Sequence, residues 1–257
     1  MATRWSCISL LLLCTAIVIF GCGGGEEGPP PPGHDPALVG KWAEVSETED
    51  GSPVTLDTNF LLTFNANGTY RADDSPLDIA YSVYWESGSW STSGNIFTAH
   101  VTASSDSESI GATHTGTYVV SGDTLTFTTV EGDGTPVTVV MVFARLGLDP
   151  ALVATWDQTA LSEDDVPVEP VPAFTLTMNG DGTFSVDEDG IPDTGDWGTY
   201  GGNTLVPIVR SAANPSEIGK QHVSTYVLSN GGNTLTLTTH EVEAGTPHTY
   251  VATLSKL

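Results

Sequence analysis

Positive charge is scarce in this chain. The sequence holds 7 Lys and Arg against 32 Asp and Glu, which gives a formal net charge of −25 at pH 7. A field of this sign repels the phosphates of nucleic acids and the anionic headgroups of lipids. The composition therefore predicts no nucleic-acid partner and no electrostatic attachment to a membrane surface.

Cysteine is also scarce, and its placement is informative. The 3 cysteines are Cys7, Cys14 and Cys22, so no thiol follows residue 22. Whatever folds beyond that point does so without disulfides, cysteine-ligated zinc, iron–sulfur clusters or thiol catalysis. A nucleophile elbow, a phosphate-binding glycine loop and paired histidines at metal spacing are missing too. We therefore expect a protein that is not an enzyme and needs no cofactor.

The N-terminus carries a targeting segment. The uncharged apolar run Cys7–Phe20 ends in Ile19-Phe-Gly-Cys22, which resembles the lipobox of bacterial lipoproteins. That resemblance implies a signal peptide over 1–21 and a diacylglycerol on the Cys22 sulfur. A transmembrane anchor and an ordinary secretory signal are the alternatives, but a run of about 14 apolar residues is shorter than the about 20 that a span needs.

Residues 22–34 follow as a lipidated cysteine and a Gly/Pro-rich tether, because Gly23–His34 has nothing with which to build a core. The lipoprotein resemblance implies a lipid-anchored envelope protein. Gly23 rather than Asp after the cysteine favours the outer membrane. Membrane contact is thus expected through the N-terminal lipid alone.

An internal duplication dominates the remainder. Asp-Pro-Ala-Leu-Val occurs at Asp35–Val39 and again at Asp149–Val153, and a tryptophan follows each copy, Trp42 and Trp156. Asn-Ala-Asn-Gly-Thr-Tyr70 and Asn-Gly-Asp-Gly-Thr-Phe184 recur at the same offset. Two units of about 110 residues, each of ordinary domain size, are therefore expected at 35–147 and 148–257.

Each repeat has the period of β-strands. Leu125-Thr-Phe-Thr-Thr129 and Leu235-Thr-Leu-Thr-Thr239 alternate large apolar residues with threonine. Asn67-Gly68 and Asp181-Gly182 mark tight hairpins between apolar runs. We predict an all-β protein with two tandem antiparallel up-and-down β-barrels of about eight strands each. An open sandwich is the alternative.

Gly40-Lys-Trp42 resembles the Gly-x-Trp signature of lipocalins and their small bacterial lipocalin-like relatives. That resemblance, over 35–257, implies that a tryptophan closes one end of each barrel beneath a basic residue from the last strand. The barrel-closing pairs would be Trp42 with Arg145 and Trp156 with Lys256. Repeat two departs from the pattern, since Ala154 replaces the glycine and lysine cannot stack as a planar guanidinium does.

Three further groups are candidate site residues. Tyr81, Tyr84 and Trp85 occur only in repeat one and could line the mouth of a ligand cavity. Asp187, Asp189 and Asp193 resemble the opening of a calcium loop, but the glutamate expected at its twelfth position is missing. His240 and His248 could form a metal site with Glu241 or Glu243, although repeat one has no counterpart and exposed strand-end histidines are favoured. Our expectation is that no metal is bound.

Two functions fit these observations. In the first, lipocalin-like domains tethered to the membrane bind a small apolar ligand. In the second, filled barrels form a non-enzymatic structural or interaction module that contacts another envelope protein. The content of the barrel interior distinguishes the two hypotheses.

Overall fold

The protein is all-β. The computed structural model describes residues 33–257 apart from 79, 133, 134 and 189. Every helix among these residues is a 3₁₀ turn of 3 residues, and none is long and apolar enough to cross a lipid bilayer. Cys22 and the expected signal peptide lie outside the described residues.

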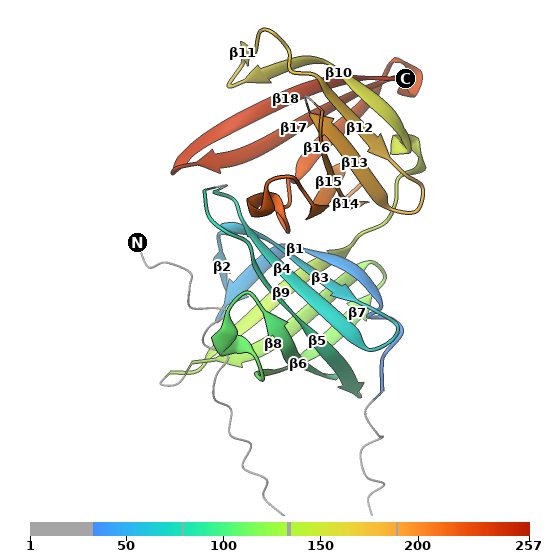
Figure 1. The fold of residues 1–257 in the computed structure, drawn as a ribbon. Coiled ribbons are helices and arrows are strands. Elements are labelled where there is room, and N and C mark those ends of the chain that lie inside the picture. The colour runs from blue at the N-terminus through green and yellow to red at the C-terminus, as the bar shows by residue number, and fades with distance from the viewer. Residues whose placement is uncertain (1–32, 79, 133–134, 189) are drawn as a thin grey trace, which may run out of the picture. The chain divides into compact units, whose positions relative to one another are not determined.

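The chain forms two compact units, and each is built around one sheet that closes on itself (Figure 1). In the first sheet the strand order is β2-β1-β3-β4-β5-β6-β7-β8-β9, and β1 also pairs with β9. Eight strands therefore make a closed antiparallel barrel, and β2 is an extra strand on β1. The strands are β1 (Gly40–Glu49), β2 (Ser52–Val54), β3 (Thr58–Phe64), β4 (Thr69–Pro76), β5 (Tyr84–Ser93), β6 (Ile96–Ser104), β7 (Thr113–Ser121), β8 (Thr124–Glu131) and β9 (Val137–Arg145).

The second sheet repeats this topology strand for strand. Its order is β11-β10-β12-β13-β14-β15-β16-β17-β18, and β10 pairs with β18 to close the ring. The predicted pair of tandem barrels is confirmed, and the open sandwich is excluded. The strands are β10 (Ala154–Glu163), β11 (Val166–Pro167), β12 (Phe174–Met178), β13 (Thr183–Glu188), β14 (Ile191–Tyr200), β15 (Thr204–Ser211), β16 (Ser224–Ser229), β17 (Thr234–Glu243) and β18 (Thr246–Lys256).

The hairpin between β3 and β4 shows how the turn residues act. Gly68 has φ of 79° and its N–H donates to the Asn65 carbonyl, so a tight turn is followed by a glycine in the left-handed region. The Asn67 side chain accepts hydrogen bonds from the backbone N–H and the hydroxyl of Thr69, at 3.1 and 2.7 Å. Asp181, Gly182 and Thr183 repeat the arrangement between β12 and β13.

Each barrel has a glycine where one strand crosses its neighbour closely. The register of β5 on β6 shifts between Ser87 and Gly88, and a β-carbon on Gly88 would lie 1.8 Å from the His100 carbonyl oxygen. The same bulge recurs between β14 and β15, where a β-carbon on Gly195 would lie 1.9 Å from the Ile208 carbonyl oxygen. Neither position can carry a side chain without moving the backbone.

Aromatic rings fill the core of the first barrel. The ring of Phe64 lies 5.3 Å from Trp90 and 5.4 Å from Phe97, centroid to centroid. Phe127 continues the contact at 5.0 Å from Phe97 and 6.1 Å from Phe143. These rings come from strands all around the barrel and meet inside it, which is the packing of a solid core.

The second barrel has smaller side chains at the same positions. By repeat register, Met178, Leu205, Leu237 and Leu254 stand where the first barrel has Phe64, Phe97, Phe127 and Phe143. The buried cluster consists of Leu152, Trp156, Leu176, Met178, Phe184, Trp197, Leu205, Val209, Tyr226, Leu235 and Leu254.

Candidate functional site

Arg145 lies over the ring of the buried Trp42 in the first barrel. Trp42 is fully buried, and its indole N–H donates to the Leu38 carbonyl at 2.7 Å. The guanidinium carbon of Arg145 lies 4.0 Å from the centre of the Trp42 ring. Arg145 also donates to the carbonyls of Val39 and Ala37, at 2.7 and 2.6 Å. The arginine thus joins the tryptophan to the segment that precedes β1.

The corresponding contact in the second barrel is looser. The Trp156 indole N–H donates to the Leu152 carbonyl at 2.9 Å, but the Lys256 ammonium lies 5.5 Å from the ring centre. A side chain on Gly40 would place its β-carbon 2.8 Å from the Arg145 guanidinium. Glycine at position 40 therefore leaves room for the Arg145 guanidinium. In repeat two, Ala154 occurs together with the slimmer Lys256.

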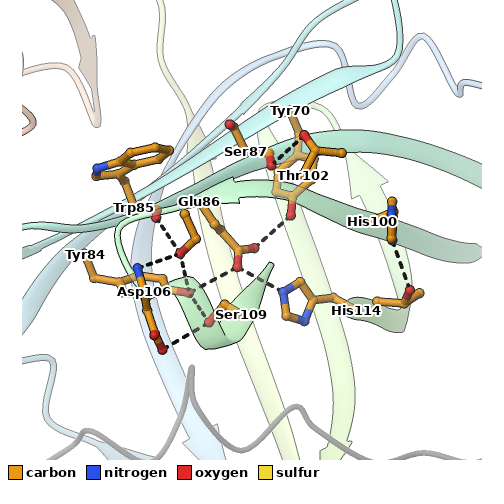
Figure 2. A network of polar contacts seen from close by, with 12 residues as sticks. Tyr70, Tyr84, Trp85, Glu86, Ser87, His100, Thr102, Asp106, Ser109 and His114 are labelled. Carbon is orange, nitrogen blue, oxygen red and sulfur yellow. Dashed lines mark hydrogen bonds and ion pairs between the residues drawn. The ribbon is translucent and has the colours of Figure 1, made fainter. Parts of the chain in front are cut away.

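A buried polar network lies at the start of β5 in the first barrel (Figure 2). Glu86, with 6% of its surface exposed, accepts hydrogen bonds from the hydroxyls of Tyr70 at 2.9 Å and Tyr84 at 3.3 Å. The Nε2 atom of His114 lies 3.0 Å from the second carboxylate oxygen. One carboxylate therefore ties together β4, β5 and β7.

The network extends to the turn after β6. The Tyr84 hydroxyl oxygen lies 3.1 Å from Ser109 Oγ, and the Ser109 hydroxyl donates to Asp106 at 3.3 Å. Asp106 caps the short 3₁₀ helix η1 (Ser107–Ser109) by accepting the Glu108 N–H. Burial, with the Glu86 charge in second place, raises the pKa of Tyr70, and burial also raises the pKa of Tyr84. Both phenols are held as neutral donors.

A further carboxyl group near this network has an altered pKa. Burial and the charges of Glu47 and Glu49 raise the pKa of Glu131 to about 7, against the smaller opposite effect of His114. Glu131 ends β8 and Glu47 lies in β1. Glu47 has only 7% of its surface exposed, so this end of the barrel holds acidic groups out of water.

The three aromatic residues expected at a ligand mouth have different surroundings. Tyr84 enters the polar network through its hydroxyl. Trp85 joins it through its backbone, and the Arg71 guanidinium carbon lies 4.7 Å from its ring centre. Tyr81 is 60% exposed.

The acidic loop of repeat two uses its side chains to hold backbone. Asp187 accepts the Gly190 N–H at 2.8 Å, and Asp193 accepts the Ala213 N–H at 3.3 Å. Asp189 lies outside the described residues. Of the three residues of the weak calcium candidate, the structure thus describes only Asp187 and Asp193.

The two histidines of the last hairpin have separate partners. His240 Nδ1 lies 3.0 Å from the Thr249 hydroxyl. His248 Nδ1 lies 3.0 Å from Glu163, the last residue of β10, and 3.0 Å from Asp164 in the turn that follows. Glu241 contacts another histidine, His222, at 2.7 Å.

Sequence reasoning missed Glu86, Tyr70 and His114. One signal could have found the histidine: His114-Thr-Gly-Thr-Tyr118 aligns with His222-Val-Ser-Thr-Tyr226, and both histidines lie beside a glutamate. The sequence matches no known protein-family model and no curated protein. Function is therefore inferred from geometry. Glu86 is buried and already accepts from three partners, which suits a group that fixes strands rather than one that reacts with a substrate.

Proposed function

We propose that this chain is a lipid-anchored envelope protein whose filled barrels form a non-enzymatic structural or interaction module. The aromatic column of the first barrel is the observation that carries the proposal. Phe64, Phe97, Phe127 and Phe143 contact one another where a ligand of a hollow barrel would sit. Binding there would require several rings to leave well-packed positions.

The polar end of the first barrel supports the same choice. Trp42 lies near the start of β1, and Glu47 follows it on the same strand by five residues, about 16 Å at the usual strand rise. Away from the tryptophan, the barrel therefore holds Glu47, Glu86 and Glu131. An apolar ligand entering here would have to lie against carboxylates to which it offers no hydrogen bonds, which is costly.

The lipoprotein part of the proposal rests on the sequence. The motif Ile19-Phe-Gly-Cys22 supplies the thiol for diacylation, and the described fold begins close behind it, where Gly33 pairs with Thr92 through two backbone hydrogen bonds. A closed eight-stranded barrel with an arginine over a buried tryptophan is compatible with a lipocalin-like, calycin-type relationship. In this proposal the protein is held at the outer membrane by its lipid and contacts an envelope protein.

Two measurements test the proposal. Tryptophan fluorescence of the full chain should stay unchanged on titration with fatty acids up to millimolar concentration, and native mass spectrometry of protein from its own host should show no bound apolar mass. A saturable fluorescence change with a co-purifying ligand would instead support the apolar-ligand function. Separately, Cys22→Ala should abolish acyl labelling and release the protein from membranes, and unchanged membrane association would contradict the lipid anchor.

A further inference from the structure

Three metal-ligand side chains converge in the second barrel, away from its aromatic plug. Glu163 ends β10, Asp164 lies in the following turn, and His248 lies near the start of β18. One ligand atom from each lies within 4.8 Å of the other two. His248 Nδ1 is 3.0 Å from Glu163 Oε1 and 3.0 Å from Asp164 Oδ2.

Backbone contacts fix the direction of the aspartate. The Asp164 N–H donates to the Thr249 carbonyl at 2.9 Å, and the Thr249 N–H donates to Asp164 Oδ1 at 2.8 Å. The other oxygen, Oδ2, is the one beside His248. The Tyr250 hydroxyl contacts Glu163 Oε1 at 3.4 Å. Neighbouring groups thus orient both carboxylates toward one point, as the outer shell of a metal site does.

The first barrel contains the same turn without the histidine. Asp50 and Thr138 exchange the matching pair of hydrogen bonds, at 2.8 and 2.9 Å, and Asp50 has φ of 47° against 48° for Asp164. Glu49 precedes Asp50 as Glu163 precedes Asp164, but Val137 stands where repeat two has His248. The turn therefore forms without an imidazole, so the fold alone does not explain His248.

We propose that Glu163, Asp164 and His248 bind a divalent transition-metal ion of the zinc type, with water completing its coordination. One imidazole nitrogen and two carboxylate oxygens form a donor set that zinc accepts. Ligands about 2.1 Å from a common ion are separated from one another by about 3.0–3.4 Å, and the two spacings from His248 Nδ1, both 3.0 Å, lie in this range. This inference is independent of the proposed interaction function.

Charge balance supports a cation at this point. The two carboxylates carry one negative charge each when ionised, and a divalent ion between them would neutralise both charges.

Calorimetric titration of the full-length protein in detergent with zinc chloride tests the site. We expect one zinc site whose affinity falls about tenfold or more in His248→Val, which restores the residue of repeat one, and in Glu163→Gln. His240→Val is the matched control, because His240 lies in the same hairpin outside the triad, and it should bind zinc as the parent does. Calcium titration controls for general cation attraction by the acidic surface and should not respond to His248→Val.

The reverse substitution gives a second, independent test. Val137→His places an imidazole beside Glu49 and Asp50 and should add a second zinc site to the chain. Circular dichroism checks that each variant is folded. If His248→Val does not fold, Glu163→Gln and Val137→His still test whether the triad binds zinc. Equal zinc binding by the parent and Glu163→Gln, or a single unchanged site in Val137→His, would overturn the proposal.

Discussion

The Tyr118 hydroxyl donates to the Asp35 carboxylate at 2.8 Å, and in the second barrel Tyr226 donates to Asp149 at 2.7 Å. Each aspartate opens a copy of the repeated Asp-Pro-Ala-Leu-Val segment. Burial, followed by the contact with the aspartate, raises the pKa of each tyrosine to about 12. A buried tyrosine hydroxyl therefore attaches each copy of the Asp-Pro-Ala-Leu-Val segment to its own barrel.

Removing the Tyr118 hydroxyl should weaken the attachment of the Asp-Pro-Ala-Leu-Val segment to the first barrel. Tyr118→Phe deletes one hydrogen bond to a charged group without opening a cavity, so we expect a loss of about 1 kcal/mol in the free energy of unfolding. Urea denaturation measures the loss, and Tyr226→Phe should give a similar value in the second barrel. Unchanged stability in both variants would show that these hydrogen bonds contribute nothing net.

Arginine and lysine at the closed ends should not be interchangeable. Arg145→Lys removes both guanidinium hydrogen bonds to Val39 and Ala37 and weakens the contact with Trp42, for an expected loss of about 2 kcal/mol. Thermal unfolding followed by tryptophan fluorescence reports the change. Arg145→Ala should lose at least as much, and an Arg145→Lys protein as stable as the parent would contradict the importance of the planar group.

The second barrel should reject an arginine unless glycine accompanies it. A β-carbon at Gly40 would lie 2.8 Å from the Arg145 guanidinium, so Lys256→Arg should be better tolerated together with Ala154→Gly. A double-mutant cycle measures this coupling, expected at about 1 kcal/mol in favour of the pair. Strictly additive effects would mean that the two positions act independently.

The raised pKa of Glu131 gives a definite sign for pH dependence. Its pKa is about 7 in the folded protein, against 4.5 for an unperturbed glutamate, so between these values the folded chain binds more protons than the unfolded chain. Stability therefore falls as pH rises through this window and levels off above it. Because Glu131 is only partly shielded from water, we expect the free energy of unfolding to fall by about 1 kcal/mol across this window.

Glu131→Gln is the matched variant for this prediction. This variant should not show the fall in stability with rising pH. It should be more stable than the parent at pH 8 and differ little from it at pH 4.5. Urea denaturation at both pH values measures the difference. Glu108→Gln, on the 3₁₀ turn after β6, is the control and should leave the pH dependence as it is in the parent. If the stability of the parent instead rises from pH 5 to pH 8, and Glu131→Gln abolishes that rise, the raised pKa of Glu131 is contradicted.

Each repeat should fold alone. Strand β1 closes on β9 and β10 closes on β18, so fragments 35–147 and 148–257 each contain every strand that their ring of backbone hydrogen bonds needs. We expect each fragment to be an all-β monomer with one cooperative unfolding transition. Failure of both fragments to fold would contradict two independent domains.

Local patterns in the sequence were enough to predict the architecture. Alternation in Leu125–Thr129 and Leu235–Thr239, with glycine turns at Gly68 and Gly182, gave strand type, hairpins and strand number, because these features depend on neighbouring residues. The extra strands β2 and β11 were not predicted, since 3 residues and 2 residues carry too little periodicity.

The polar sites depend on register between distant strands, and periodicity does not report register. Glu86 meets Tyr70 and His114 only after β4, β5 and β7 are aligned around the barrel. From the sequence, the acidic residues considered beside His248 were Glu241 and Glu243 of its own hairpin, although an exposed histidine was favoured. Its carboxylate partners instead come from β10 and the turn after it, 84 residues away in sequence for Asp164.

The crossing glycines Gly88 and Gly195 indicate what the two copies of the gene had to retain after they separated. Four positions that hold phenylalanine in the first core hold methionine or leucine in the second, yet both copies have glycine where a β-carbon would meet a carbonyl oxygen at 1.8 and 1.9 Å. The same core positions thus accept side chains of different size. The two crossing positions have no room even for a β-carbon, so a saturation library should tolerate substitution least at Gly88 and Gly195.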